Sequence, residues 1–191
     1  MKKLAKSAVS LLEQLFITMF VISLVFTYIF RVVNVDGESM CNTFADGDRI
    51  IINLADRSYK TGDIAVMYPQ NAVILDENGS ISKGEGIGKV IIKRIIATEG
   101  QTVDIDFSAG IVTVDGERLY EDYLDLGLTH YDGGAFTGKY PVTVPRGYVF
   151  VMGDNRSVSL DSRSDKIGFV AEDDIIGEAF IRIYPRFEMY P

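Results

Sequence analysis

A run of sixteen uncharged residues near the N-terminus constrains the fold more than any other feature of the sequence. It extends from Leu15 to Phe30 and reads LFITMFVISLVFTYIF. As a helix rising about 1.5 Å per residue, it would cover roughly 24 Å of a hydrocarbon core about 30 Å thick. Leu11, Leu12, Val32 and Val33 would extend its apolar reach. We predict an uncleaved membrane anchor over residues 1–31.

Two other interpretations of this segment are weaker. A cleaved secretory signal would end in small residues of the A-x-A type, but the chain continues with RVVNVD from Arg31 to Asp36. A buried core helix is the other alternative. Lys2, Lys3 and Lys6 precede the run, and an excess of lysine and arginine marks the cytoplasmic side of a membrane. We therefore predict a cytoplasmic N-terminus and an extracytoplasmic body.

Composition limits what the rest of the chain can be. The 191 residues are 47% hydrophobic and 24% charged, which suits one globular domain with an appendage. The net charge of −8 argues against a nucleic-acid partner. A single cysteine excludes an internal disulfide, and one cysteine with one histidine excludes the usual Cys/His zinc clusters. We expect no metal or other cofactor. The sequence leaves the oligomeric state open.

The body, residues 32–191, has the pattern of a mainly β protein. Short β-branched runs recur between turn signals such as Asp46-Gly47 and Asp115-Gly116. The expected strands are Arg49 to Asn53, Asp63 to Met67, Lys89 to Ile96, Thr102 to Ile105, Ile111 to Val114, Tyr148 to Met152 and Ala179 to Ile183. Such spacing favours a folded barrel or sandwich.

Two stretches of the body look like insertions. Residues 70–88 are polar and rich in glycine, and we interpret them as a flexible connection. Residues 104–143 contain the larger part of a hairpin expected over Val103 to Leu119, followed by a looser region around His130. We predict that residues 104–143 form an insertion subdomain of the catalytic body.

Ser39 and Lys93 are the most informative pair of reactive residues. A serine nucleophile needs a base, and lysine can serve if burial lowers its pKa well below about 10.4. Strand alternation places Lys93 on the same face as Ile91 and Ile95, which is unusual for a solvated lysine. The alternative is an edge strand guarded by a charge.

Cys41 and His130 form a second possible nucleophile pair. They are the only residues of their types, and His130 lies in the loose region without an evident carboxylate to orient it. A lone cysteine is usually a packing residue. We therefore expect Cys41 to pack beside Ser39 rather than react.

A third stretch, VFVMGDNRSVSLDSR from Val149 to Arg163, runs from an apolar strand into a loop dense in hydrogen-bonding groups. Ion pairs within the loop could do no more than fix its shape. One of its hydroxyl groups could also orient the amine of Lys93.

In these stretches the chain resembles the bacterial type I signal peptidases, membrane-anchored serine proteases that use a Ser/Lys dyad. The resemblance runs in order along nearly the whole chain. Besides the anchor, it rests on Gly37, Ser39, Met40 and Thr43, on Gly47 and Asp48, on Lys93 and Arg94, and on the GDNRSVSLDSR motif from Gly153 to Arg163. The last motif is the most specific.

The resemblance implies roles for individual residues. Ser39 would be the nucleophile, Lys93 the general base, and Ser159 the hydroxyl that positions the Lys93 amine. The backbone N–H of Ser39 would donate to the oxyanion, whereas Gly37 stands where some relatives have a serine that adds a donor. Structural support would come from Arg94, Asp154, Arg156, Asp161 and Arg163.

The resemblance also implies a substrate and a location. Signal peptides of exported preproteins would bind in extended form, with small residues at −1 and −3, beside an anchor in the cell membrane. Two departures bear on substrate fit: Asn42 replaces the proline of Ser-Met-x-Pro-Thr, and Ala97 to Gln101 replaces Gly-x-Pro-Gly-Asp. The alternatives are a self-cleaving Ser/Lys protease and a membrane-anchored binding protein for pilus or surface-protein assembly. Retention of Ser39, Lys93 and Ser159 argues against the second.

Overall fold

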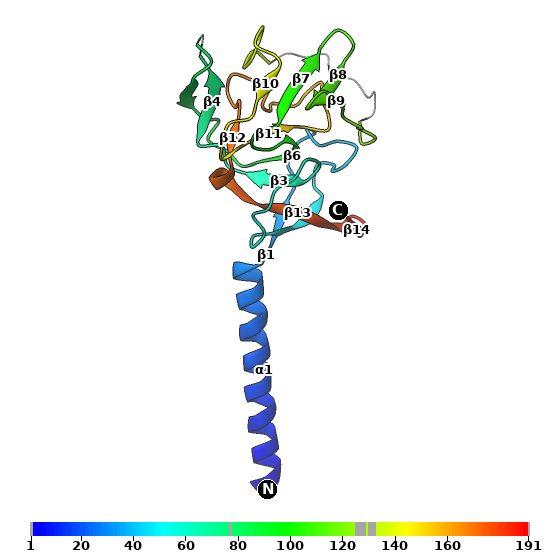
Figure 1. Cartoon of the computed structure of the whole chain (residues 1–191). Helices are drawn as coiled ribbons and strands as arrows, with labels where there is room; N and C mark the ends of the chain where they lie inside the picture. Colours follow the sequence, from blue (N-terminus) through cyan, green and yellow to red (C-terminus); the bar gives the residue numbers. More distant parts are fainter. Residues whose placement is uncertain (1, 77, 125–128, 130–132, 191) are drawn as a thin grey trace.

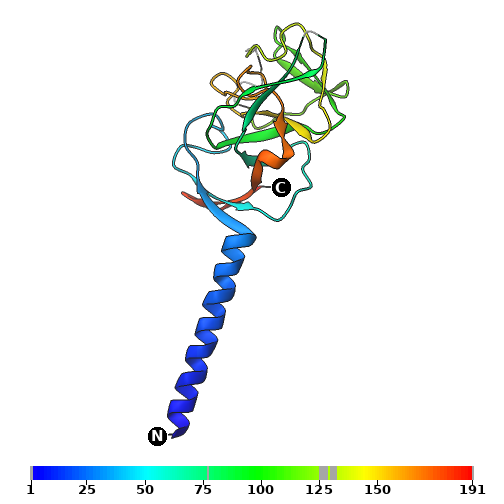
Figure 2. The same ribbon diagram turned by 90° about the vertical axis from the view of Figure 1, so that its left-hand side faces the viewer.

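The computed structural model describes residues 2–76, 78–124, 129 and 133–190. A single long helix, α1 (Lys2–Tyr28), extends away from a β-rich body (Figures 1 and 2). The stretch Val9–Tyr28 is long and apolar enough to cross a membrane, and none of it is buried in the protein. The structure thus confirms a mainly β chain with one N-terminal apolar helix.

The helix ends earlier than the predicted apolar reach. Val32 and Val33 do not extend it, because β1 (Phe30–Asn34) pairs along its whole length with β2 (Arg49–Asn53). The expectation that these two valines extend the apolar reach of the helix was wrong, whereas the predicted anchor itself ended at residue 31. Their β-branched side chains suit an extended strand better than a helix.

One large antiparallel sheet forms the lower part of the body. Its eight strands run in the order β1-β2-β13-β3-β6-β11-β12, with β14 paired to β13. The remaining members are β3 (Ile64–Met67), β6 (Ile91–Ala97), β11 (Tyr148–Met152), β12 (Val170–Ala171), β13 (Ile175–Tyr184) and β14 (Glu188–Met189), with a 3₁₀ turn η1 (Glu172–Asp174) before β13. β11 pairs with the part of β6 from Arg94 to Ala97. Lys93 is buried, so the alternative in which it is a solvated charge guarding a sheet edge was wrong.

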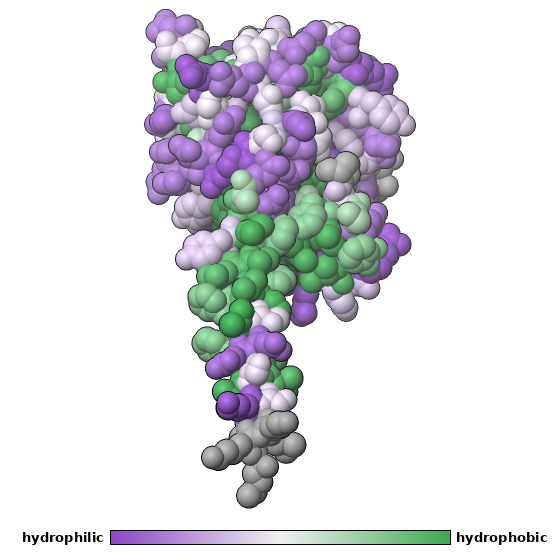
Figure 3. All heavy atoms as spheres, turned by 60° about the horizontal axis from the view of Figure 1, so that its bottom comes forward, coloured by the Kyte–Doolittle hydropathy of each residue, from purple (hydrophilic) through white to green (hydrophobic). Residues whose placement is uncertain are grey.

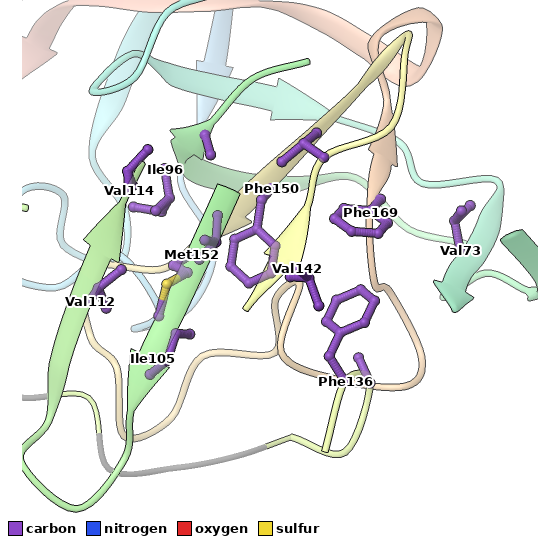
Figure 4. Packing of buried hydrophobic residues seen from close by; sticks show 14 residues of the cluster. Val73, Ile96, Ile105, Val112, Val114, Phe136, Val142, Phe150, Met152 and Phe169 are labelled. Atoms are coloured by element: carbon purple, nitrogen blue, oxygen red, sulfur yellow. The ribbon is translucent and has the colours of Figure 1, made fainter. Parts of the chain in front are cut away.

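A second, four-stranded sheet lies at the far end of the body from the helix (Figure 1). Its order is β10-β7-β8-β9, from β7 (Thr102–Asp106), β8 (Ile111–Val114), β9 (Glu117–Arg118) and β10 (Val142–Thr143). Figure 4 shows side chains of this sheet, such as Ile105 and Val112, packed with Phe150 and Met152 of β11 in one apolar cluster. The division of the chain at 104–143 stays a prediction.

The stretch 70–88 forms a hairpin rather than a simple connection. It contains β4 (Asn71–Leu75) and β5 (Ile81–Glu85), paired antiparallel. All five residues of β5 are exposed, so the sequence carries no hydrophobic alternation there. Val73 of β4 is buried against the body, which anchors the hairpin.

Candidate active site

Ser39 lies in the loop that joins β1 to β2, and tight turns fix this loop. The N–H of Cys41 donates to the carbonyl of Glu38 at 3.0 Å, and the N–H of Phe44 donates to the carbonyl of Met40 at 2.8 Å. The side chains of Met40 and Phe44 are buried in the apolar cluster beneath the loop. Burial of these two side chains leaves Ser39 at the surface of the core, lining a cleft.

The structure brings Ser39 and Lys93 together. The Nζ of Lys93 lies 2.6 Å from the Oγ of Ser39, although the two residues are 54 positions apart in the sequence. The same Nζ donates to the carbonyl of Ile92 at 2.9 Å. The side chain of Lys93 is only 3% exposed.

Burial lowers the pKa of Lys93 to about 8, because the apolar surroundings disfavour the charged amine. Asp161 and Asp154 oppose this change, whereas Lys89 and Arg163 reinforce it. With a pKa of about 8, about a tenth of the amine is neutral at pH 7. Lys93 can therefore accept a proton near neutral pH.

Cys41 is a poor nucleophile in this setting. Partial burial raises the pKa of its thiol, and the carboxylates of Glu38, Asp46 and Asp48 raise it further. The thiolate is the reactive form of cysteine, so these charges work against reaction. His130 lies outside the described residues.

The loop from Gly153 to Arg163 is held by a buried ion pair. The guanidinium of Arg163 donates to both carboxylate oxygens of Asp161, from Nε and Nη2, each at 2.8 Å. Asp161 also accepts the N–H of Gly153 at 3.0 Å. Burial raises the pKa of Asp161, but the charge of Arg163 and the hydrogen bonds to the carboxylate together outweigh burial, so the net pKa is lowered. The carboxylate stays ionised.

The Gly153–Arg163 loop packs directly against the backbone of Ser39. The N–H of Asn155 donates to the carbonyl of Ser39 at 3.0 Å. A Cβ on Gly153 would lie 2.4 Å from that carbonyl oxygen and 2.3 Å from the Oγ of Ser159, closer than real contacts allow. The position therefore requires glycine.

Ser159 is buried at this same contact. Its side chain is buried, and its Oγ has no hydrogen-bond partner among the described residues. The two hydrogen bonds of the Lys93 amine go to Ser39 and Ile92. A hydrogen bond from Ser159 to Lys93 stays a prediction.

Arg94 and Asp154 tie three segments together. Arg94 donates to Asp154 from Nε at 2.9 Å and from Nη2 at 2.7 Å, and its Nη1 donates to the carbonyl of Gly62 at 2.8 Å. Asp154 also accepts the hydroxyl of Thr43. The ring of Tyr123 lies 3.9 Å from the guanidinium carbon of Arg94. This network joins β6 and the two loops of the site.

Arg156 connects the same loop to the segment that contains Glu121. Its Nε donates to the carbonyl of Gly153 at 3.0 Å, and its Nη2 pairs with Glu121. Glu121 lies between β9 and β10 in the chain, and it was not predicted from the sequence. A buried glutamate with no local apolar pattern leaves no signal that would have marked it.

Arg182 is a further buried cation that the sequence analysis missed. Its Nη1 donates to the carbonyl of Thr43 at 2.9 Å and to Asp48 at 3.1 Å. The stretch FIRIY around it resembles the stretch IIKRII around Lys93, because each places a cation between apolar strand residues. That pattern could have marked Arg182 as buried.

The two departures from the family pattern form ordered turns. Asn42 adopts a φ of +91°, and its Nδ2 donates to the carbonyl of Tyr123 at 3.3 Å. Proline is locked near a φ of about −65°, so it cannot replace Asn42 without moving the loop. In the other departure, the Oε1 of Gln101 accepts the N–H of Thr98 at 3.0 Å.

A cleft of about 710 Å³ opens beside the Ser39–Lys93 contact. Its walls are mostly apolar and come from residues 33–39 and 89–93, with Ile50, Val66, Val158 and Leu160. In the part of the chain that the structure describes, no cluster of three His, Cys, Asp or Glu side chains could hold a metal ion.

Comparisons with known proteins agree on one family. A family model described as signal peptidase, peptidase S26, matches residues 8–184. The probable signal peptidase I-1 of Synechocystis is 36% identical over 154 residues, which cover 79% of this chain and 69% of that protein. Signal peptidase IB of Staphylococcus aureus is 32% identical over 162 residues, which cover 79% of this chain and 76% of that protein.

The solved structures include a similar protein. The crystal structure of a signal peptidase I from Enterococcus faecalis is 25% identical, with a TM-score of 0.45. The match covers 63% of this chain and 96% of that one.

Proposed function

This chain belongs to the signal peptidase family, peptidase S26, and we propose that it removes signal peptides from exported preproteins with Ser39 as nucleophile and Lys93 as general base. One observation carries this assignment. The Oγ of Ser39 lies 2.6 Å from a buried lysine amine whose pKa is about 8. A hydroxyl and a base in this arrangement form an activated nucleophile.

Lys93 moves the proton in both halves of the proposed reaction. Its neutral amine takes the proton of Ser39 as Oγ attacks the scissile carbonyl. The protonated amine then gives that proton to the leaving amino group, and an acyl-enzyme remains. Lys93 next takes a proton from water as the water oxygen attacks the acyl carbonyl. The bond to Ser39 then breaks, Lys93 returns its proton to the Oγ of Ser39, and the signal peptide leaves with a new carboxylate.

The oxyanion that forms during attack needs a donor. Among the described residues, no group accepts the N–H of Ser39, so this N–H is available for the developing charge. Gly37 provides no side-chain donor two positions earlier. A backbone donor aimed at the developing charge is the usual device for acyl transfer.

The cleft suits an extended peptide. Two stretches of backbone, residues 33–39 and 89–93, line it next to the reacting atoms. A substrate between them could form main-chain hydrogen bonds as an added strand, and the apolar walls could select small side chains. We propose that the −1 and −3 residues of the preprotein lie here.

The membrane-facing side of the body supports a location at the bilayer surface. Val32, Ile51, Ile181 and Met189 stand opposite one another across β1, β2, β13 and β14, so their side chains share one face of the sheet. Val32 is 45% exposed and Met189 is 66% exposed. Figure 3 shows that hydrophobic atoms continue from the helix onto the base of the body.

The proposed orientation places the N-terminus in the cytoplasm and the body outside. The lysines that precede the apolar run support it, because positive charge favours the cytoplasmic side. The site would then lie where signal peptides emerge from the membrane. A non-catalytic assembly protein is not favoured, because the matched relatives carry signal peptidase names.

Cleavage of a preprotein by the purified full-length chain in detergent tests this proposal. We expect N-terminal sequencing of the product to place the cut after a small-x-small site. Ser39→Ala and Lys93→Ala should each abolish cleavage, because each removes one member of the dyad. Ser157→Ala and Lys166→Ala are matched controls at exposed positions and should cleave at the wild-type rate.

Two results would contradict the assignment. Cleavage that survives in Ser39→Ala and disappears in Cys41→Ala would make the cysteine the nucleophile. Cleavage at the wild-type rate in Lys93→Ala would show that Lys93 is not the general base.

A further inference from the structure

The backbone carbonyl of Thr43 accepts two donors from the C-terminal part of the chain. The Nη1 of Arg182 donates to it at 2.9 Å, and the hydroxyl of Tyr190 donates to it at 3.2 Å. Both donors lie about 140 residues from Thr43 in the sequence. Tyr190 lies six residues beyond the last residue that the family model matches.

Backbone hydrogen bonds connect Thr43 to the residue that follows Ser39. The carbonyl of Met40, the residue after Ser39, accepts the N–H of Thr43 at 3.0 Å and that of Phe44 at 2.8 Å. A displacement of Thr43 would therefore move Met40 and the backbone of the nucleophile. The ring of Tyr190 also packs edge-on against Phe44, with the centroids 4.7 Å apart.

We propose that Tyr190 is a positioning residue of the active site: its hydroxyl and ring hold Thr43 and Phe44 so that the Oγ of Ser39 stays against the amine of Lys93. This inference rests on the proposed function, because it assigns a role toward the same nucleophile. Tyr190 does not touch the reacting atoms and acts through the loop.

The β13–β14 hairpin explains how Tyr190 reaches the loop. Arg182 pairs in register with Glu188 and forms an ion pair with it, and the N–H of Tyr190 donates to the carbonyl of Phe180 at 2.8 Å. Met189 and Tyr190 alternate, so Met189 is exposed and Tyr190 packs on the apolar cluster with Phe44. Burial raises the pKa of Tyr190, so its hydroxyl stays protonated and remains a donor.

The kinetics of two Tyr190 variants test the proposal in the full-length protein. Tyr190→Phe keeps the ring and removes one hydrogen bond, and we expect kcat to fall about fivefold with KM within twofold of wild type. Tyr190→Ala also removes the ring contact and should lower kcat at least twentyfold. The acid limb of the pH–rate profile should stay near pH 8 in both, because the burial and the charges that set the pKa of Lys93 do not involve Tyr190.

Tyr184 provides the matched control in the same hairpin. It is 57% exposed, and its ring contacts Arg49 rather than the nucleophile loop. Tyr184→Phe and Tyr184→Ala should keep the wild-type kcat. Wild-type kcat in Tyr190→Ala, or an equal fall in Tyr184→Ala, would overturn the proposal.

Hydrogen exchange separates this inference from the proposed function, because it needs no substrate. Amides of residues 38–44 should exchange faster in Tyr190→Ala than in wild type, and at the wild-type rate in Tyr184→Ala. Unchanged exchange in Tyr190→Ala would overturn the positioning role. If the wild-type chain cleaves no preprotein, the proposed function fails while exchange still decides whether Tyr190 holds the loop.

Discussion

Strand β6 buries Lys93 and the Gly153–Arg163 loop buries Arg163, and the two cations differ in whether a carboxylate pairs with them. Arg163 in the loop is 1% exposed and makes a two-pronged ion pair with Asp161. Lys93 in the strand is 3% exposed, and its amine contacts only the neutral oxygens of Ser39 and Ile92. The ion pairs among the described residues do not include Lys93.

The difference separates a structural charge from a reactive one. A guanidinium keeps its proton in proteins, and its planar fork matches a carboxylate, so Arg163 can fix the loop but cannot act as a base. Burial without a carboxylate partner destabilises the charged form of an amine relative to the neutral form, and the pKa of the amine falls. In the proposed active site, burial of Lys93 therefore lowers the stability of the fold, whereas the ion pair of Arg163 with Asp161 makes the loop rigid.

Breaking the paired cation should have the largest effect on stability. Asp161→Asn leaves the charge of Arg163 buried without an anion, and we expect the free energy of unfolding to fall by about 3–5 kcal/mol. Denaturant unfolding measures the change. Asp165→Asn, at an exposed position of the same segment, should change it by less than about 0.5 kcal/mol. Equal losses in the two variants would contradict the role of the pair.

The same ion pair predicts a pH dependence of the wild-type protein. The pKa of Asp161 is lowered on folding, so the stabilisation is fully present above the unfolded value of 3.8. It is lost as the pH falls through the lower folded value. Asp161→Asn should lack this acid-dependent loss.

Forcing the two loops apart should have the next largest effect. Gly153→Ala introduces a Cβ 2.4 Å from the carbonyl oxygen of Ser39, so the backbone of the nucleophile must move. We expect a loss of about 1–3 kcal/mol in stability and at least a tenfold loss of cleavage rate. In Gly84→Ala the new Cβ would meet its nearest neighbour at 3.7 Å, an ordinary contact, and cleavage should persist. Equal cleavage in the two variants would contradict the close approach.

Removing Lys93, the cation without a carboxylate partner, should raise the free energy of unfolding rather than lower it. Lys93→Met should abolish cleavage, but it also removes a buried amine, so we expect the free energy of unfolding at pH 7 to rise by about 1–3 kcal/mol. The pKa of Lys93 is lowered on folding from 10.5 to about 8. The gain should therefore be greatest below pH 8 and disappear as the pH rises toward 10.5. Lys166→Met is the exposed control, and a destabilised Lys93→Met would contradict the account.

The smallest effect concerns the charge at the rim of the cleft. Lys89 is exposed and lowers the pKa of Lys93 through its positive charge. Lys89→Ala should shift the acid limb of the pH–rate profile upward by a fraction of a pH unit. Salt should reduce the difference between variant and wild type, because it screens exposed charges. A downward shift would contradict the assignment.

The strands that the sequence predicted best are those with strong β-branched runs. The structure places β2, β8 and β11 at the predicted bounds. The exposed hairpin β4–β5 was missed because β5 buries none of its residues and shows no alternation. Only Arg31 separates Val32 and Val33 from the apolar run, so hydropathy alone could not separate strand from membrane span.

The candidate site could be predicted where its reactive or paired groups lie in short motifs, but not where it depends on contacts between residues far apart in the chain. Ser39, Lys93 and the motif from Gly153 to Arg163 carry reactive or paired groups in short stretches. Arg182 and Tyr190 contact the nucleophile loop from a hairpin about 140 residues away. Only the folded register brings these two side chains to Thr43, so no spacing in the sequence indicates the contact.

The pH dependence of kcat/KM for preprotein cleavage tests the central claim most directly, because it reports the pKa of the base in the free enzyme. The account predicts that cleavage rises with pH and levels off above an acid limb near pH 8, the pKa of Lys93. A limb near the ordinary lysine value of 10.5 would contradict the proposal that buried Lys93 is the general base.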